Sequence, residues 1–313
     1  MVLSHYKSGD VATRKSMMAS ISVIIPVYNG EQYIRKTLES IFAQTYQDYE
    51  IVCVDDESKD ASLAILNEYR DRINVVQQAN TGQAGARNAG AKTGTGKYLA
   101  FLDQDDRWYP QALERQVAVL EANPEAVMVH CDMDWIDETG HVTQRSLVSA
   151  SRRSVHKGVT MPQLVGWDPC IYPSTMLIRR VAFDRVGGFD PELRSYGEDI
   201  DLMLRLRPEG RFIFLEETGT QYRKHSTNFS GSGSDAMFRC AEKFFQKLKV
   251  CYVGDKRKQA LLNRFLANLY SDWGKMKMYS GLRGEAQCLL LRSIKYYPWQ
   301  FRTYSRLIRS IGV

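Results

Sequence analysis

The sequence predicts an α/β protein with a mainly parallel sheet flanked by helices, followed by a C-terminal helical appendage. Short apolar, β-branched runs alternate with helical segments from residue 21 to residue 122, the pattern of parallel strands joined by crossover helices. Beyond the Ser/Gly-rich stretch 230–234, the pattern becomes helical throughout. A chain of 313 residues is long enough for one large domain and an appendage.

The expected elements follow in a regular order. The run 21–28 is a buried strand because it is rich in Ile and Val and ends at Asn29-Gly30. Segment 31–44 is a helix with Ile34, Leu38 and Ile41 on one face. The same criteria predict strands at 49–54, 73–76, 98–102, 126–131, 174–178 and 212–215, and helices at 60–70, 82–92, 110–122 and 198–206. After residue 236, glycine or proline interrupts the predicted helices near 254, 281–284 and 298.

The net charge of +6 conceals a split along the chain. Residues 234–313 carry 16 of the 42 basic and 5 of the 36 acidic side chains, a net of +11, so the preceding residues carry −5. We therefore expect a mobile leader at 1–19, a body at 20–233 and a basic helical region at 234–313. No run approaches the roughly 18 apolar residues of a membrane span, the leader lacks an apolar signal core, and no C-x-x-C pair occurs. These features predict a cytoplasmic protein.

Polar clusters follow three of the predicted strands. They are Tyr28-Asn29, Asp55-Asp56 and the run 103–106. Because ligands bind beyond the carboxyl ends of strands in such sheets, the clusters predict a binding site at one edge. The run Asp103-Gln104-Asp105-Asp106 has three carboxylates in four residues, which suits Mg²⁺ or Mn²⁺ and a diphosphate. The alternative is a solvated acidic turn.

Other candidate residues each have a structural alternative. Asp55 and Asp56 are expected either to accept hydrogen bonds from a nucleotide or to cap a helix. Arg87 lies in a small-residue segment, 81–90, that allows close packing, and its guanidinium could neutralise phosphate. The acids at 198–201 either complement a helix dipole or supply a general base. His225 is either a structural histidine or a metal ligand.

Together these motifs resemble family 2 glycosyltransferases of the GT-A fold over about residues 20 to 230. The resemblance rests on the runs 22–29, 54–58, 86–90, 101–106, 187–190 and 197–201. It implies inverting transfer of a sugar from a nucleoside diphosphate sugar, with UDP favoured, and a Mn²⁺ or Mg²⁺ ion. It also implies donor-binding residues Pro26, Val27, Tyr28, Asp55, Asp56, Arg87, Asp103, Gln104 and Asp105, metal ligands Asp105, Asp106 and His225, and a catalytic base Asp199 with Glu198 beside it.

The resemblance leaves the acceptor open. A saccharide or a lipid-linked hydroxyl in cell envelope polysaccharide or glycan synthesis is expected, with acceptor contacts in 142–172. The Q-x-x-R-W motif of processive synthases is absent. Two alternatives remain: a non-catalytic carbohydrate- or partner-binding protein on the same scaffold, and a polyprenyl-phosphate glycosyl donor synthase.

The basic C-terminal region resembles a degenerate tetratricopeptide-like helical pair. Its charge has two interpretations: a solvated face of a packing appendage, or peripheral contact with an anionic membrane at the inner face. Nucleic acid is not expected as a partner, because no recognition motif accompanies the charge.

Overall fold

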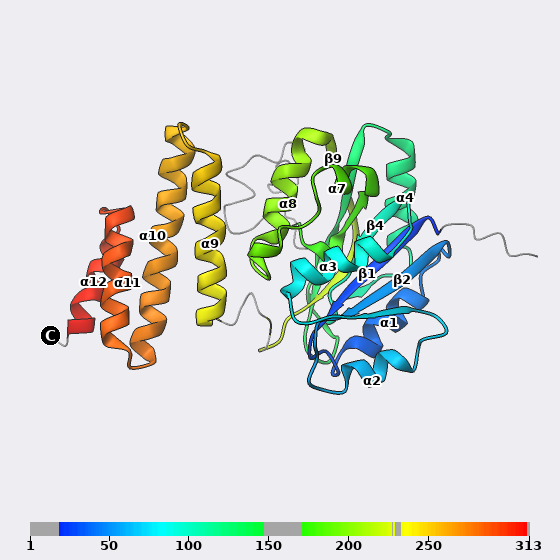
Figure 1. The fold of residues 1–313 in the computed structure, drawn as a ribbon, viewed down its shortest axis with the longest axis horizontal. Coiled ribbons are helices and arrows are strands. Elements are labelled where there is room, and N and C mark those ends of the chain that lie inside the picture. The colour runs from blue at the N-terminus through cyan, green and yellow to red at the C-terminus, as the bar shows by residue number, and fades with distance from the viewer. Residues whose placement is uncertain (1–18, 147–170, 227, 229–232, 312–313) are drawn as a thin grey trace, which may run out of the picture.

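The computed structural model describes residues 19–146, 171–226, 228 and 233–311. Its centre is a nine-stranded sheet in the order β3-β2-β1-β4-β8-β6-β9-β5, with β7 paired to β6 (Figure 1). The strands are β1 Ile21–Val27, β2 Tyr49–Asp55, β3 Asn74–Gln77, β4 Tyr98–Phe101, β5 Arg107–Trp108, β6 Ala126–Ile136, β7 Val142–Gln144, β8 Met176–Arg179 and β9 Arg211–Arg223.

The first four strands, β1 to β4, form the parallel half of the sheet. β1 lies between β2 and β4, and β2 pairs with β3, all in parallel register. Val27 pairs with Asp55, and Asp55 pairs with Gln77, so the carboxyl ends of three strands meet at one edge. The predicted alternation of strand and helix is confirmed here, with boundaries shifted by at most three residues.

The second half of the sheet is mixed. β8 runs antiparallel to β4 and β6, β6 and β9 are parallel, and β5 pairs antiparallel with β9. Strands β6 and β9 both extend well beyond their predicted ends. Glu216 and Glu217 look like strand terminators, but the register jumps from Leu215 to Thr218 and accommodates them as a bulge. That extension brings β9 to the acidic run that follows β4.

Helices cover both faces of the sheet. One core packs α1 Ile34–Phe42, α2 Ser62–Asn67 and α4 Ala112–Ala122 on the sheet. A second packs α3 Gly82–Thr93, α7 Arg180–Arg185 and α8 Glu198–Leu206 on the opposite face. Gly90 explains the small residues of α3, because a Cβ there would lie 2.4 Å from the side chain of Ile24 in β1. Short 3-10 turns lie at Pro173–Thr175, Pro191–Leu193 and Arg207–Glu209.

Four helices form the C-terminal region: α9 Asp235–Cys251, α10 Lys256–Tyr279, α11 Arg283–Tyr296 and α12 Phe301–Ile311 (Figure 1). The interruptions fall where glycine and proline predict them. A third core joins α9 and α10 to residues around α8, including Leu193, Tyr196 and Ile200. Among the described residues, no helix combines the length and apolar character needed to cross a membrane.

Candidate active site

A cleft of about 950 Å³ opens at the carboxyl ends of β1 and β4. Its walls come from segment 26–33, which comprises the last two residues of β1 and the loop that follows. The loop after β2, the start of α3, the run 103–105 and the start of α9 complete them. The clusters predicted to meet at one edge of the sheet therefore do meet. The cleft includes the candidate residues Pro26, Val27, Tyr28, Asp56, Asp103, Gln104, Asp105 and His225.

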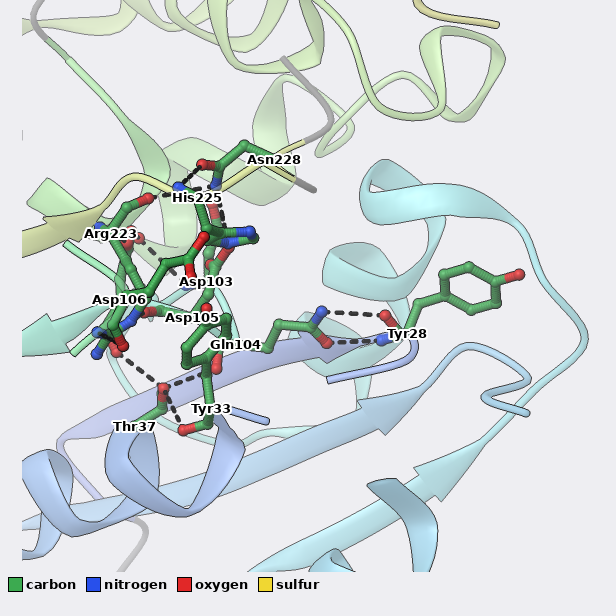
Figure 2. Close-up of polar contacts among 12 residues, drawn as sticks. Tyr28, Tyr33, Thr37, Asp103, Gln104, Asp105, Asp106, Arg223, His225 and Asn228 are labelled. Carbon is green, nitrogen blue, oxygen red and sulfur yellow. Dashed lines mark hydrogen bonds and ion pairs between the residues drawn. The ribbon is translucent and has the colours of Figure 1, made fainter. Parts of the chain in front are cut away.

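Gln104 holds the end of β1 through the backbone of Tyr28. The Tyr28 N–H donates to Gln104 Oε1 at 2.8 Å, and Gln104 Nε2 donates to the Tyr28 carbonyl at 3.0 Å. Figure 2 shows this pair of bonds and the Tyr28 ring directed away from the acidic run. The Tyr28 side chain is 48% exposed, so its ring offers a flat surface on which a planar base can stack.

The two aspartates after β2 differ in their surroundings. Asp56 lines the cleft, but its carboxylate accepts the N–H groups of Thr81 at 2.9 Å and Gly82 at 2.8 Å, at the start of α3. It therefore caps α3 rather than the helix that follows it in sequence. The carboxylate of Asp55 is buried and is not among the cleft-lining groups; its Oδ1 has no hydrogen-bond partner among the described residues.

Arg87 links the acidic run to the start of α8. Its guanidinium is buried and donates to Asp103 Oδ1 at 2.7 Å and to Glu198 Oε1 at 2.8 Å. The structure thus differs from the expectation of an arginine open to phosphate, because both carboxylates engage it inside the protein. A buried cation between two carboxylates offsets part of the desolvation that each would suffer alone.

Asp105 and His225 form a pair at the cleft. Asp105 Oδ2 lies 2.8 Å from His225 Nε2 and accepts a hydrogen bond from Asn228 Nδ2 at 3.3 Å (Figure 2). The His225 ring also packs against Tyr33, with ring centroids 5.0 Å apart. One carboxylate and one imidazole are suitable ligands for a divalent ion. Among the described residues, no group of three His, Cys, Asp or Glu side chains is placed to hold a metal ion.

Asp106 does not face the cleft, contrary to the expectation of a metal ligand. It is 1% exposed, and its two oxygens accept the Ser174 hydroxyl at 2.6 Å and the Arg223 N–H at 2.9 Å. Burial, with Asp105 and Asp103 nearby, raises the pKa of Asp106 well above its usual range. Its observed contacts tie the acidic run to β9 and to the turn before β8.

Glu198 and Asp199 occupy the first turn of α8. Burial is the main cause that raises the pKa of Glu198 to about 7; the charge of Asp199 adds to it, and Arg87 opposes it. Burial likewise raises the pKa of Asp199, whose Oδ1 accepts the N–H of Ile200 at 2.7 Å. Neither side chain is among the cleft-lining groups, and Glu198 lies behind the Arg87 bridge to Asp103.

Comparison with known proteins identifies the family. The model of the family described as glycosyl transferase family 2 matches residues 22–187 of the chain. The chain belongs to this family. A similar protein is uncharacterized glycosyltransferase RP339 of Rickettsia prowazekii, 33% identical over 207 residues. The match covers 66% of this chain and 64% of that relative, so it spans slightly less than two thirds of the relative's length.

Solved structures support the GT-A fold of this family member. S. aureus TarS 1–349 in complex with UDP-GlcNAc superposes with a TM-score of 0.59 at 18% identity, covering 93% of this chain and 89% of that one. GalNAc-T7 with UDP, GalNAc and Mn²⁺ has a TM-score of 0.54 at 18% identity, covering 74% of this chain and 48% of that one. At these identities the likeness concerns the fold alone.

Arg223 is the main site residue of this family 2 chain that the motifs do not reveal. Its Nε donates to the Asp105 carbonyl at 2.8 Å, its backbone N–H binds Asp106, and its guanidinium lies over the Tyr33 ring at 4.7 Å. The consecutive cations Arg223 and Lys224 beside His225 could have indicated it, because an acidic cluster needs cations nearby. Asn228 and Ser174 carried no such signal.

Proposed function

We propose that this protein is a glycosyltransferase that moves a sugar from a nucleoside diphosphate sugar, with UDP favoured, to a hydroxyl of an acceptor. The observation that carries the proposal is the cleft at the carboxyl strand ends, with the exposed Tyr28 ring at one end and the Asp105–His225 pair at the other. The base of the nucleotide would stack near Tyr28, beside Pro26 and Val27. The diphosphate would then point toward Asp105.

The structural relatives support UDP as the nucleotide. TarS was solved with UDP-GlcNAc, and GalNAc-T7 was solved with UDP, GalNAc and Mn²⁺. Both share the fold of this chain, so a nucleotide placed at the same sheet edge would occupy the cleft described above. Residues 1–233 carry a net charge of −5, which makes a divalent ion the natural counterpart of a diphosphate there.

We propose that Asp105 and His225 would hold a Mn²⁺ or Mg²⁺ ion. The donor set fits, because both side chains reach the cleft and each presents an atom that suits such an ion. Two protein ligands leave coordination positions for the diphosphate oxygens. The bound ion would neutralise the negative charge that develops on the departing diphosphate. Asp103 would act from beside it, held by Arg87.

We further propose Asp199 as the general base, with Glu198 as its neighbour. A base must be ionised to accept the proton of the attacking hydroxyl, and a single displacement from the opposite face inverts the anomeric centre. Burial raises the pKa of Asp199, which makes its carboxylate a stronger base than an exposed aspartate. Transfer should therefore weaken as the pH falls through this raised pKa.

The acceptor proposal is a hydroxyl of a saccharide or of a lipid-linked glycan in cell envelope polysaccharide or glycan synthesis. Most of the segment expected to contact it, 142–172, lies outside the described residues. We propose a cytoplasmic location with peripheral contact at the inner face of the membrane, through residues 234–313. Residues 20–233 would carry the transferase chemistry.

A donor screen tests this function. UDP or GDP release from a panel of nucleotide sugars is measured with and without Mn²⁺, using the full chain and the variants Asp199→Asn and Asp105→Asn. Asp199→Asn should lower turnover by about 10²–10⁴-fold with UDP affinity kept. Asp105→Asn should weaken UDP binding in Mn²⁺, as should EDTA on the unaltered chain.

The matched control is Asp184→Asn, an exposed aspartate on α7 outside the cleft, which should behave like the unaltered chain. Near-normal turnover of Asp199→Asn would remove the base assignment. UDP affinity indifferent to both EDTA and Asp105→Asn would remove the metal assignment. Absence of UDP binding altogether would favour a scaffold without transferase activity.

A further inference from the structure

Helix α12 presents its apolar side to solvent. Phe301, Ile308 and Ile311 are 77%, 56% and 62% exposed, and Tyr304 is 39% exposed. Positions 301, 304, 308 and 311 follow helical spacing and therefore form one stripe. Trp299, 72% exposed, lies just before the helix. A surface helix normally buries such a stripe against the protein, whereas α12 exposes its apolar face and packs its polar face.

The opposite, polar side of α12 is the side that packs on the protein. Thr303 is buried and donates from Oγ1 to Ser271 Oγ of α10 at 2.9 Å. Arg306 donates to Ser271 Oγ and to Asp272 Oδ1, each at 2.8 Å. These bonds fix the rotation of α12 about its axis, because turning the stripe inward would break them and bury unpaired polar groups.

The surroundings of the stripe are positively charged. Residues 286–313 contain five basic side chains, Arg292, Lys295, Arg302, Arg306 and Arg309, and no acidic one. At 100° per residue, the exposed Arg309 and Arg302 lie on the flank between the stripe and the packed side, about 80–100° around the helix from Phe301, and Arg302 lies 3.9 Å from Asp272 of α10. An apolar stripe with an aromatic residue at one end and arginines on the adjacent flank has the character of a helix that lies in a membrane interface.

We propose that α12, with Trp299, docks on an anionic lipid surface. In Figure 1, α12 lies at the end of the molecule away from the sheet, where a flat surface can reach it. Charge selects this occupant: residues 286–313 carry five basic side chains and no acidic one, so a second copy of the chain would bring like charges together, whereas anionic headgroups neutralise them. The inference deepens the peripheral contact of the proposed function by assigning it to one helix, and it requires no transferase activity.

Co-sedimentation of the full chain with vesicles tests the docking. Vesicles of phosphatidylcholine with 30% phosphatidylglycerol are compared with vesicles of phosphatidylcholine alone, at low and high salt. We expect binding to the anionic vesicles only, weakened by salt. Ile308→Asp should weaken it more than tenfold, and Arg302→Gln and Arg309→Gln about fivefold each. A blue shift of Trp emission on binding should be reduced in Trp299→Phe.

Val181→Asp is the matched control, because Val181 is 62% exposed on α7 of the body and lies outside the stripe. It should bind vesicles like the unaltered chain. UDP affinity and thermal unfolding should be the same for Ile308→Asp and for the unaltered chain, which separates failure of docking from failure of the proposed function. Three results would overturn the docking: no binding, binding equal in Ile308→Asp, or a concentration-dependent dimer that Ile308→Asp dissociates.

Discussion

Arg87 organises the charges around the acidic run. It contacts Asp103 on the cleft side and Glu198 on the helix side, so its one positive charge is shared by two carboxylates. Glu198 is buried beside Asp199, and the net result is a pKa of about 7, far above its usual value of 4.5. Protonation of Glu198 is therefore coupled to folding.

This coupling predicts how stability depends on pH. Because the folded state binds the Glu198 proton more tightly than the unfolded chain does, its contribution to stability is lost as the pH rises from 4.5 to about 7. Over that range, the free energy of unfolding of the unaltered chain should fall by about 1–3 kcal/mol relative to Glu198→Gln. Urea unfolding at several pH values measures this. The exposed Glu39→Gln is the control, and parallel curves for both variants would contradict it.

At the scale of elements, α9 packs against the turn that begins α8 and fixes its position. Gly197 begins α8 in the left-handed region, with φ at 76°, and a Cβ there would lie 2.6 Å from the Phe244 ring of α9. Lys247 of α9 binds both Asp190 and Asp201 on either side of that turn. Helix α9 thereby positions the turn that carries Glu198 and Asp199.

Two glycine substitutions distinguish the cost of displacing Phe244 from the cost of backbone strain alone. Gly187 has φ at 80° with nothing within 4 Å of its Cβ position, so Gly187→Ala should cost about 1 kcal/mol from strain. Gly197→Ala carries the same strain and also displaces Phe244, so it should cost about 1–3 kcal/mol more. Chemical unfolding of both variants measures the difference. Equal costs would mean that α9 does not constrain the turn.

For the whole molecule, the change in composition near residue 233 does not coincide with a break in packing. Ile200 and Leu204 of α8 and Tyr196 before it pack in the same core as α9 and α10. Ser234, Ala236 and Cys240 of the C-terminal region line the cleft. The sequence division at 233 is therefore one of charge and secondary structure, while folding is expected to be shared across it.

Truncation tests that shared folding. Ending the chain at residue 233 exposes Leu193, Ile200 and Leu204, and the loss of their packing should cost about 3–6 kcal/mol. Removing only 299–313 deletes a helix held mainly by polar contacts and should cost much less. Thermal unfolding followed by circular dichroism compares the two. A 1–233 chain as stable as the unaltered protein would show that the two parts fold independently.

Much of the body could be predicted from local patterns. Apolar runs ending in polar clusters predicted strands β1 to β4 and the edge at which their carboxyl ends meet, because strand direction and crossover handedness leave few arrangements. The lengths of β6 and β9 could not be predicted this way. Their extensions depend on pairing with each other and on a bulge at Glu216 and Glu217, which local sequence reads as a turn.

The sequence by itself determined the parallel half of the sheet, the family and the gathering of acids at one edge, since these follow from short-range periodicity and order along the chain. The tertiary structure decided what each acid does. Asp106 is buried by Ser174 and Arg223, whereas Asp105 meets His225 across 120 positions of sequence. It also decided that α12 turns its apolar side outward. Desolvation and pairing depend on which distant segments pack together, and no local pattern encodes that.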